Sequence, residues 1–125
     1  MKIDGKKALK VLEEAREAKN ELLYEKALTL YTEYLNMVDP SFTHGVWNSM
    51  AEILFAQNKW NDALTHCNKA LEIMKDFVPA LELRIKIQSA LGNLNQTYED
   101  QTKIKELEAI EKSKWDDPNH YYHYK

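Results

Sequence analysis

The apolar positions of residues 27–38 and 63–74 follow the same spacing. In each stretch they fall at i, i+1, i+4, i+7, i+8 and i+11, and each stretch opens with the letters A-L-T. This spacing gathers the apolar side chains on one face of an amphipathic helix. The first set is Ala27, Leu28, Tyr31, Tyr34, Leu35 and Val38, and the second is Ala63, Leu64, Cys67, Ala70, Leu71 and Met74.

A second amphipathic helix precedes each of these stretches. An aromatic residue, Tyr24 or Trp60, lies three positions before the alanine that opens each stretch. Upstream of these aromatic residues, 8–19 and 46–57 again carry apolar side chains at helical spacing. The pattern therefore predicts a repeated unit of helix, short turn and helix.

A third unit is expected about 34 residues after the second. There Leu94 and Thr97 take the places of Trp60 and Ala63, and residues 80–93 supply the preceding helix. Gly92 lies between the two helices of this unit, where a residue in the left-handed conformation is favoured, and Asn58 has the matching place in the second unit. The sequence predicts three helix pairs.

These spacings resemble the tetratricopeptide repeat, whose pattern is W-x2-L-G-x2-Y, then Ala, three residues, Phe and a late Pro. The second unit matches best, with Trp47, Met50, Ala51, Leu54, Ala63 and Cys67. The first unit keeps Ala15, Ala27 and Tyr31, and its proline, Pro40, falls one residue late. The third unit has Leu81 at the Trp position but departs from the pattern at Arg84, Ile85, Thr97 and Gln101.

The resemblance implies an all-α fold, a right-handed superhelical array of antiparallel helix pairs with three repeats and a C-terminal capping helix. The repeat domain is expected at residues 1–114, with units at about 7–40, 43–76 and 78–112, followed by an aromatic C-terminal tail at 115–125. Trp47 is expected to pack between the first and second units. The capping helix is expected to present a partial apolar stripe of Tyr98, Ile104, Leu107 and Ile110.

Composition narrows the classes of function. With a net charge of −3, the protein lacks the positive electrostatic potential that attracts nucleic acid. The sequence has no apolar run long enough for a membrane span and no signal-peptide stretch, so a cytoplasmic location is expected. The single cysteine, Cys67, cannot form an intrachain disulfide and lies on a predicted core face, where it acts as a small buried apolar residue.

The sequence offers no site for catalysis. Three scattered glycines exclude a glycine-rich phosphate loop, and Cys67 is predicted to be buried rather than nucleophilic. His120 and His123 lack a third metal ligand nearby. We therefore expect no enzymatic activity, no cofactor and no metal.

In the tetratricopeptide repeat family, the first helix of each pair forms a concave surface that binds partner peptides or helices. The residues that the resemblance places there are Arg16, Lys19, Asn20, Asn48, Ser49, Glu52, Phe55, Glu82 and Lys86. One branch of the family holds the C-terminal carboxylates of heat-shock chaperones with a Lys/Asn/Asn/Lys/Arg clamp. At those positions this chain has Leu12, Arg16, Ser49, Pro79 and Leu83, which disfavours such a ligand.

The sequence thus predicts a non-enzymatic interaction module or adaptor that binds another protein as a peptide or helix, with no nucleic acid and no membrane involved. The alternatives are a structural subunit that associates with itself and a co-chaperone fragment. Self-association could use the aromatic tail, since an ordinary disordered tail is poor in aromatic residues. The aromatic residues of that tail are Trp115, Tyr121, Tyr122 and Tyr124.

Overall fold

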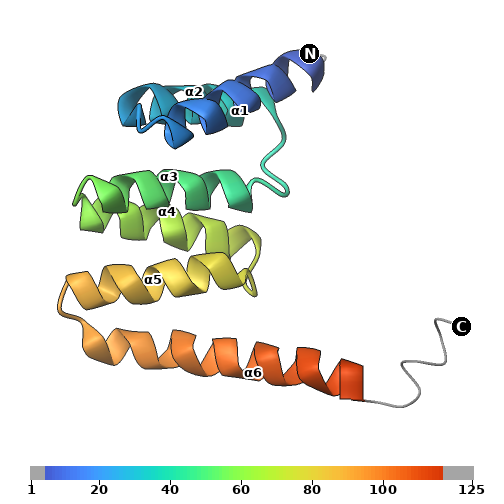
Figure 1. Cartoon of the computed structure of the whole chain (residues 1–125), viewed down its shortest axis with the longest axis vertical. Coiled ribbons are helices and arrows are strands. Elements are labelled where there is room, and N and C mark those ends of the chain that lie inside the picture. Colours follow the sequence, from blue (N-terminus) through green and yellow to red (C-terminus); the bar gives the residue numbers. More distant parts are fainter. Residues whose placement is uncertain (1–4, 117–125) are drawn as a thin grey trace, which may run out of the picture.

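The computed structural model describes residues 5–116, which form six α-helices and one short 3-10 helix. Consecutive helices run antiparallel and stack along one axis, from α1 at one end to α6 at the other (Figure 1). The expected all-α helical repeat is thereby confirmed. The elements are α1 (Gly5–Asn20), α2 (Tyr24–Met37), α3 (His44–Ala56), α4 (Trp60–Ile73), α5 (Val78–Ala90), η1 (Leu94–Gln96) and α6 (Thr97–Asp116).

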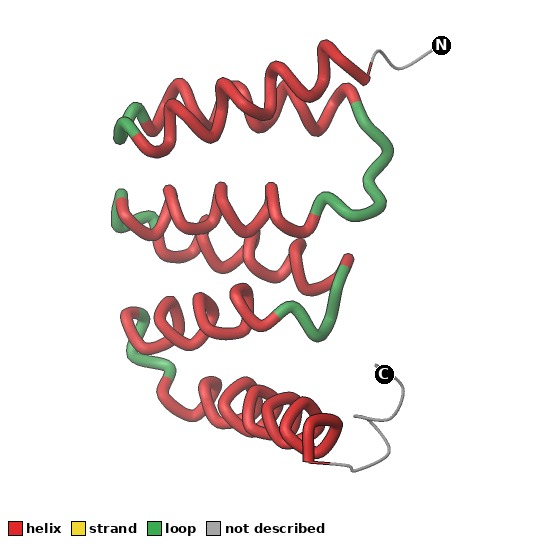
Figure 2. Tube along the Cα trace, turned by 45° about the vertical axis from the view of Figure 1, so that its right-hand side comes forward, coloured by secondary structure: helices red, strands yellow, loops and turns green. Residues whose placement is uncertain are grey.

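The connections alternate between two edges of the stack. The turns within the pairs lie along one edge, and the loops α2–α3 and α4–α5 lie along the other (Figure 2). Val38 and Met74, the last apolar positions of the two repeated stretches, follow the ends of α2 and α4 in extended conformation. Within residues 5–116, no helix combines the length and apolar character needed to cross a membrane.

A left-handed residue closes the first helix of each pair. Its φ is 62° at Leu22, 61° at Asn58 and 81° at Gly92. In each turn the next N–H donates to a carbonyl five residues back, at 2.9 Å for Leu23 and Lys59 and at 2.8 Å in the third unit. This is the Schellman arrangement that ends many helices. Asn58 and Gly92 were predicted from their conformational preferences, whereas Leu22 was not.

Small residues allow the helices of each pair to pack closely. Ala15, Ala27, Ala51 and Ala63 are fully buried, and a close-packed interior needs side chains of this size where two helices cross. The buried side chains form two core clusters. One cluster belongs to the first unit and α3, and the other belongs to the second and third units. Trp47 packs against both clusters. The predicted packing of Trp47 between the first two units is confirmed.

The third unit is held differently from the first two. Its only buried residues on α6, within the described part of that helix, are Thr97 and Asp100, and both are polar. Thr97 lies where Ala63 lies in the second unit, so the predicted register of this position is confirmed. Ile104 and Leu107 are partly buried against the core.

One detail of the predicted C-terminal part is wrong. Tyr98 and Ile110 are exposed rather than part of an apolar stripe, because successive steps of three residues fall short of a helical turn and drift off the buried face. Trp115 lies inside α6, which continues to Asp116, and the division of the chain at 114/115 remains a prediction. Tyr121, Tyr122 and Tyr124 lie outside the described residues.

Candidate peptide-binding groove

A cavity of about 320 Å³ lies between the first and second units. We call this cavity the α1–α3 groove. Residues from α1, α2, α3 and the α2–α3 loop line it: Leu12, Arg16, Tyr31, Tyr34, Phe42, Gly45, Val46 and Ser49.

Helical spacing explains how the groove is built. Leu12 and Arg16 on α1 are four residues apart, as are Gly45 and Ser49 on α3, so each pair lies on one side of its helix. A Cβ built on Gly45 meets no atom within 4 Å, so a side chain at this position would project into open space. The missing side chain of Gly45 therefore leaves the groove open at the start of α3.

Arg16 is the cation of this groove. It is exposed, and among residues 5–116 no ion-pair partner for it is found. Lys19, one turn further along α1, is instead neutralised by Glu52 of α3, whose Oε2 lies 3.0 Å from the Lys19 Nζ. The guanidinium of Arg16 thus remains available for an acidic group, and its planar fork suits a carboxylate.

Asn48 takes part in the same network from a buried position. Its Nδ2 donates to the Oε1 of Glu52 at 3.2 Å, while the Oδ1 is buried without a hydrogen-bond partner among the described residues. The family resemblance placed Asn48 on the partner-binding surface, and its contact with a partner remains a prediction. In this structure its amide is turned to Glu52, so Asn48 positions that carboxylate rather than facing solvent.

The other residues predicted to bind a partner are spread more widely. Arg16 and Ser49 meet in the α1–α3 groove, and Lys19, Asn48 and Glu52 form the adjacent network. Phe55 is partly buried against the core cluster of the second and third units. The exposed residues Asn20, Glu82 and Lys86 lie outside the groove lining, and their contact with a partner remains a prediction.

Sequence reasoning missed most of the groove lining. Tyr31 and Tyr34 were recognised only as apolar positions of a helix, although both also border the cavity. Phe42 and Gly45 gave no usable signal, because one lies in a loop and the other is a single glycine near a helix start. Their role depends on where α3 lies against α1 and α2, which no local pattern contains.

Comparisons with known proteins agree with this architecture. A family model described as Tetratricopeptide repeat matches residues 44–77, which span α3, α4 and the turn between them. A search of curated protein sequences gave no match. The chain contains a tetratricopeptide repeat and has the fold of this family.

Two solved structures of tetratricopeptide repeat domains are similar over most of their length. The first TPR of Spaghetti (RPAP3), bound to the HSP90 peptide SRMEEVD, has a TM-score of 0.75 and 25% identity, covering 86% of this chain and 85% of that one. The second TPR of Spaghetti, bound to the same peptide, has a TM-score of 0.70 and 20% identity, covering 78% and 88%. At 20% identity, the second structure is similar to this chain in fold alone.

The third repeat replaces an apolar contact of this fold by a polar one. Arg84 of α5 donates from Nε and Nη2 to the two carboxylate oxygens of Asp100 on α6, at 2.7 and 2.6 Å. Its Nη1 donates to Asn68 Oδ1 of α4 at 3.0 Å. This hydrogen bonding with Asp100 raises the pKa of Arg84. The departure of Arg84 from the repeat pattern is therefore a bidentate ion pair that joins α5 to α6.

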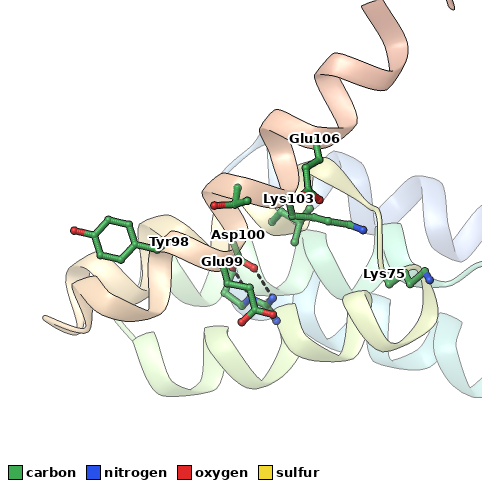
Figure 3. Close-up of a pocket in the computed structure, with 9 residues that line it drawn as sticks. Lys75, Tyr98, Glu99, Asp100, Lys103 and Glu106 are labelled. Atoms are coloured by element: carbon green, nitrogen blue, oxygen red, sulfur yellow. Dashed lines mark hydrogen bonds and ion pairs between the residues drawn. The ribbon is translucent and has the colours of Figure 1, made fainter. Parts of the chain in front are cut away.

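A larger cavity of about 590 Å³ lies beside this ion pair (Figure 3). Its lining includes Arg84, Asp100 and Lys103, whose charges are paired, since Lys103 lies 3.1 Å from Asp76 and Arg84 binds Asp100. It also includes Lys75, Glu99 and Glu106, which form no ion pair among the described residues. An acidic segment there would meet the carboxylates of Glu99 and Glu106 as well as the cation of Lys75. The lining of the α1–α3 groove has the cation of Arg16 and no carboxylate, so this groove is the better candidate for binding an acidic segment.

Cys67 is a core residue, as predicted. The thiol is fully buried and donates to the Ala80 carbonyl at 3.0 Å. Burial raises the pKa of Cys67 to about 12, so the reactive thiolate is suppressed at neutral pH.

Proposed function

We propose that this chain is a non-enzymatic interaction module that binds a peptide or helix of another protein in the α1–α3 groove. The observation that carries the proposal is Arg16, a cation without an ion-pair partner among the described residues, placed in a cavity with Tyr31 and Tyr34. An Arg–carboxylate contact is stronger and more directional than a neutral hydrogen bond. The preferred partner segment therefore carries an acidic side chain that reaches Arg16.

The comparisons support peptide binding by this kind of array. The first TPR of Spaghetti binds an HSP90 peptide and resembles this chain over 86% of its length. The same peptide is a poor candidate here, since Leu12 and Leu83 are buried and Pro79 has no donor at three of the clamp positions. The proposal is thus an adaptor or scaffold of the cytoplasm with a different ligand.

The absence of catalysis is part of the proposal. The one thiol of the chain, Cys67, is buried in the core with its pKa raised to about 12, so it is a poor nucleophile. Within residues 5–116, no three His, Cys, Asp or Glu side chains are grouped so that they could hold a metal ion. We therefore propose that the groove binds a partner and catalyses no reaction.

The test uses eight-residue peptide libraries that differ only in one fixed residue, Glu or Gln, with binding measured by fluorescence polarisation. We expect the wild-type chain to prefer the Glu library and Arg16→Gln to lose that preference. Lys26→Gln is the matched control, because Lys26 is an exposed cation of α2 outside the groove lining.

A second pair of variants blocks the groove instead of changing its charge. Gly45→Leu should fill the groove and abolish Glu-dependent binding, because a side chain there enters open space. Gly5→Leu, at the start of α1, also meets no atom within 4 Å and serves as the control. Unchanged peptide binding by Gly45→Leu, with an intact helical signal, would refute the proposed site.

A further inference from the structure

A second cavity shares the lining residue Phe42 with the α1–α3 groove. Its other lining residues come from the α2–α3 loop, the start of α3 and the end of α4, and the α2–α3 and α4–α5 loops run along one edge of the stack (Figure 2). Its volume is about 430 Å³. We call it the Phe42 pocket, and its lining consists of Pro40, Ser41, Phe42, His44, Ile73 and Met74. Phe42 lines both cavities, so the two cavities are neighbours at this residue.

The position of Phe42 is not explained by folding. Its side chain is 83% exposed, so little apolar surface is removed from water. Its φ is 63°, in the left-handed region that disfavours residues with a side chain. Glycine or asparagine would suit this backbone better. A strained, exposed aromatic residue between two cavities is the kind of outlier from which a binding role can be inferred.

His44 lines the Phe42 pocket, and its ring is held by Phe77. Its ring packs edge-on against Phe77, with the ring centroids 4.7 Å apart. Its Nδ1 is buried and has no hydrogen-bond partner among the described residues. Buried polar atoms are nearly always hydrogen-bonded, so one that is not calls for an explanation. The same holds for Asn48 Oδ1 and Gln57 Oε1 among the described residues, so this atom does not by itself indicate a ligand.

The two cavities differ in charge, and this difference indicates which kind of partner side chain each cavity would bind. The groove holds the unpaired cation Arg16, whereas no residue lining the Phe42 pocket carries a formal charge with His44 neutral. Asp39, which precedes the pocket, already accepts a hydrogen bond from the Ser41 N–H at 2.8 Å. The pocket is therefore suited to an apolar side chain.

We infer that the partner segment is bipartite, with an acidic residue at Arg16 and a branched apolar side chain, such as Leu, in the Phe42 pocket. The inference rests on the proposed function and adds the second half of its ligand. Phe42 would lie between the two side chains of the partner and cover the backbone that joins them.

The test uses synthetic eight-residue peptides that carry one Glu and one Leu separated by one to four residues. Matched peptides replace Leu by Ser or Glu by Gln. For the best spacing we expect the Leu peptide to bind the full chain about tenfold more tightly than the Ser peptide, which corresponds to about 1.4 kcal/mol. Phe42→Gly should bring that ratio close to one.

Leu22→Gly is a close control for Phe42→Gly. Leu22 is also exposed, at 68%, and has a φ of 62°, but it lines neither cavity. Both changes relieve a left-handed residue and remove an exposed apolar side chain, so both variants should fold. Only Phe42→Gly should lose the preference for the Leu peptide.

Each other outcome overturns the inference in a distinguishable way. Equal binding of Leu and Ser peptides, with the dependence on Glu and Arg16 intact, rejects the Phe42 pocket and leaves the groove standing. Loss of all Glu dependence rejects the proposed function as well. Self-association that Phe42→Gly abolishes, or tighter binding of a peptide of residues 117–125, would assign the pocket to a second copy or to the chain's own end.

Discussion

The ion pair between Arg84 and Asp100 makes the sharpest prediction about stability. The carboxylate is only 4% exposed and accepts two hydrogen bonds from the guanidinium, which is 28% exposed. Arg84→Met keeps the apolar stem of the side chain but leaves Asp100 buried beside α5 without its cation. Removing one partner of a buried pair costs about 3–5 kcal/mol, and we expect the lower end because Arg84 reaches solvent.

Replacing Asp100 alone should lower the free energy of unfolding less than Arg84→Met does, and replacing both residues should lower it least. In Asp100→Leu the guanidinium can turn to water, so we expect a loss of about 1–2 kcal/mol. Replacing a buried pair by apolar residues of similar volume is often neutral or stabilising. The variant with both changes should therefore lie within about 1 kcal/mol of the wild type.

Urea denaturation of the four proteins, followed by helical circular dichroism, gives the coupling energy as a double-mutant cycle. Lys19→Met is the control, because the Lys19–Glu52 pair is partly exposed and should contribute less than about 1 kcal/mol. If Arg84→Met costs less than about 1 kcal/mol, or if the two single losses simply add, the ion pair does not hold α6. Ile104 and Leu107 would then be its main attachment.

Three further predictions follow from the core and the groove. Trp47→Ala should cost about 3–5 kcal/mol in chemical denaturation, because Trp47 packs against both core clusters, and a loss below about 1 kcal/mol would contradict this packing. The peptide SRMEEVD should bind no more tightly than about 1 mM, or about −4 kcal/mol, and micromolar affinity by calorimetry would overturn the clamp argument. Burial raises the pKa of Cys67 from 9.0 to about 12, so the unfolded thiol ionises first as the pH rises above 9.0. The contribution of the buried neutral thiol to stability is therefore complete below pH 9.0 and lost as the pH rises towards 12. The free energy of unfolding of Cys67→Ala should depend less on pH over that range.

The helix pairs could be predicted from the sequence because they depend on local spacing. Ala27 and Ala63 mark the same buried position in two units, and Thr97 keeps that position in the third. Asn58 and Gly92 could be placed in left-handed turns, since these residues tolerate a positive φ. Leu22 could not, because leucine disfavours a positive φ.

The polar anchor of the third unit lay beyond sequence reasoning for a different reason. Arg84 stands at a position where the repeat has an apolar residue, and this looked like degeneration of the motif. Its partners, Asn68 and Asp100, lie 16 residues away in each direction, on other helices. Only the crossing of α4, α5 and α6 brings the three side chains together. A residue that departs from a motif can thus form an interaction with a partner that is distant in the sequence.

The same geometry explains why binding and stability can be separated in the first two units. Arg16 follows the fully buried Ala15 on α1, and Ser49 precedes the buried Met50 on α3. One residue turns a helix by about 100°, so a neighbour of a core residue can face a cavity without entering the core. Changes at Arg16 or Ser49 therefore alter the groove and leave the small-residue contacts between the helices intact. Loss of peptide binding by Arg16→Gln, with unchanged stability, would thus report on the groove itself.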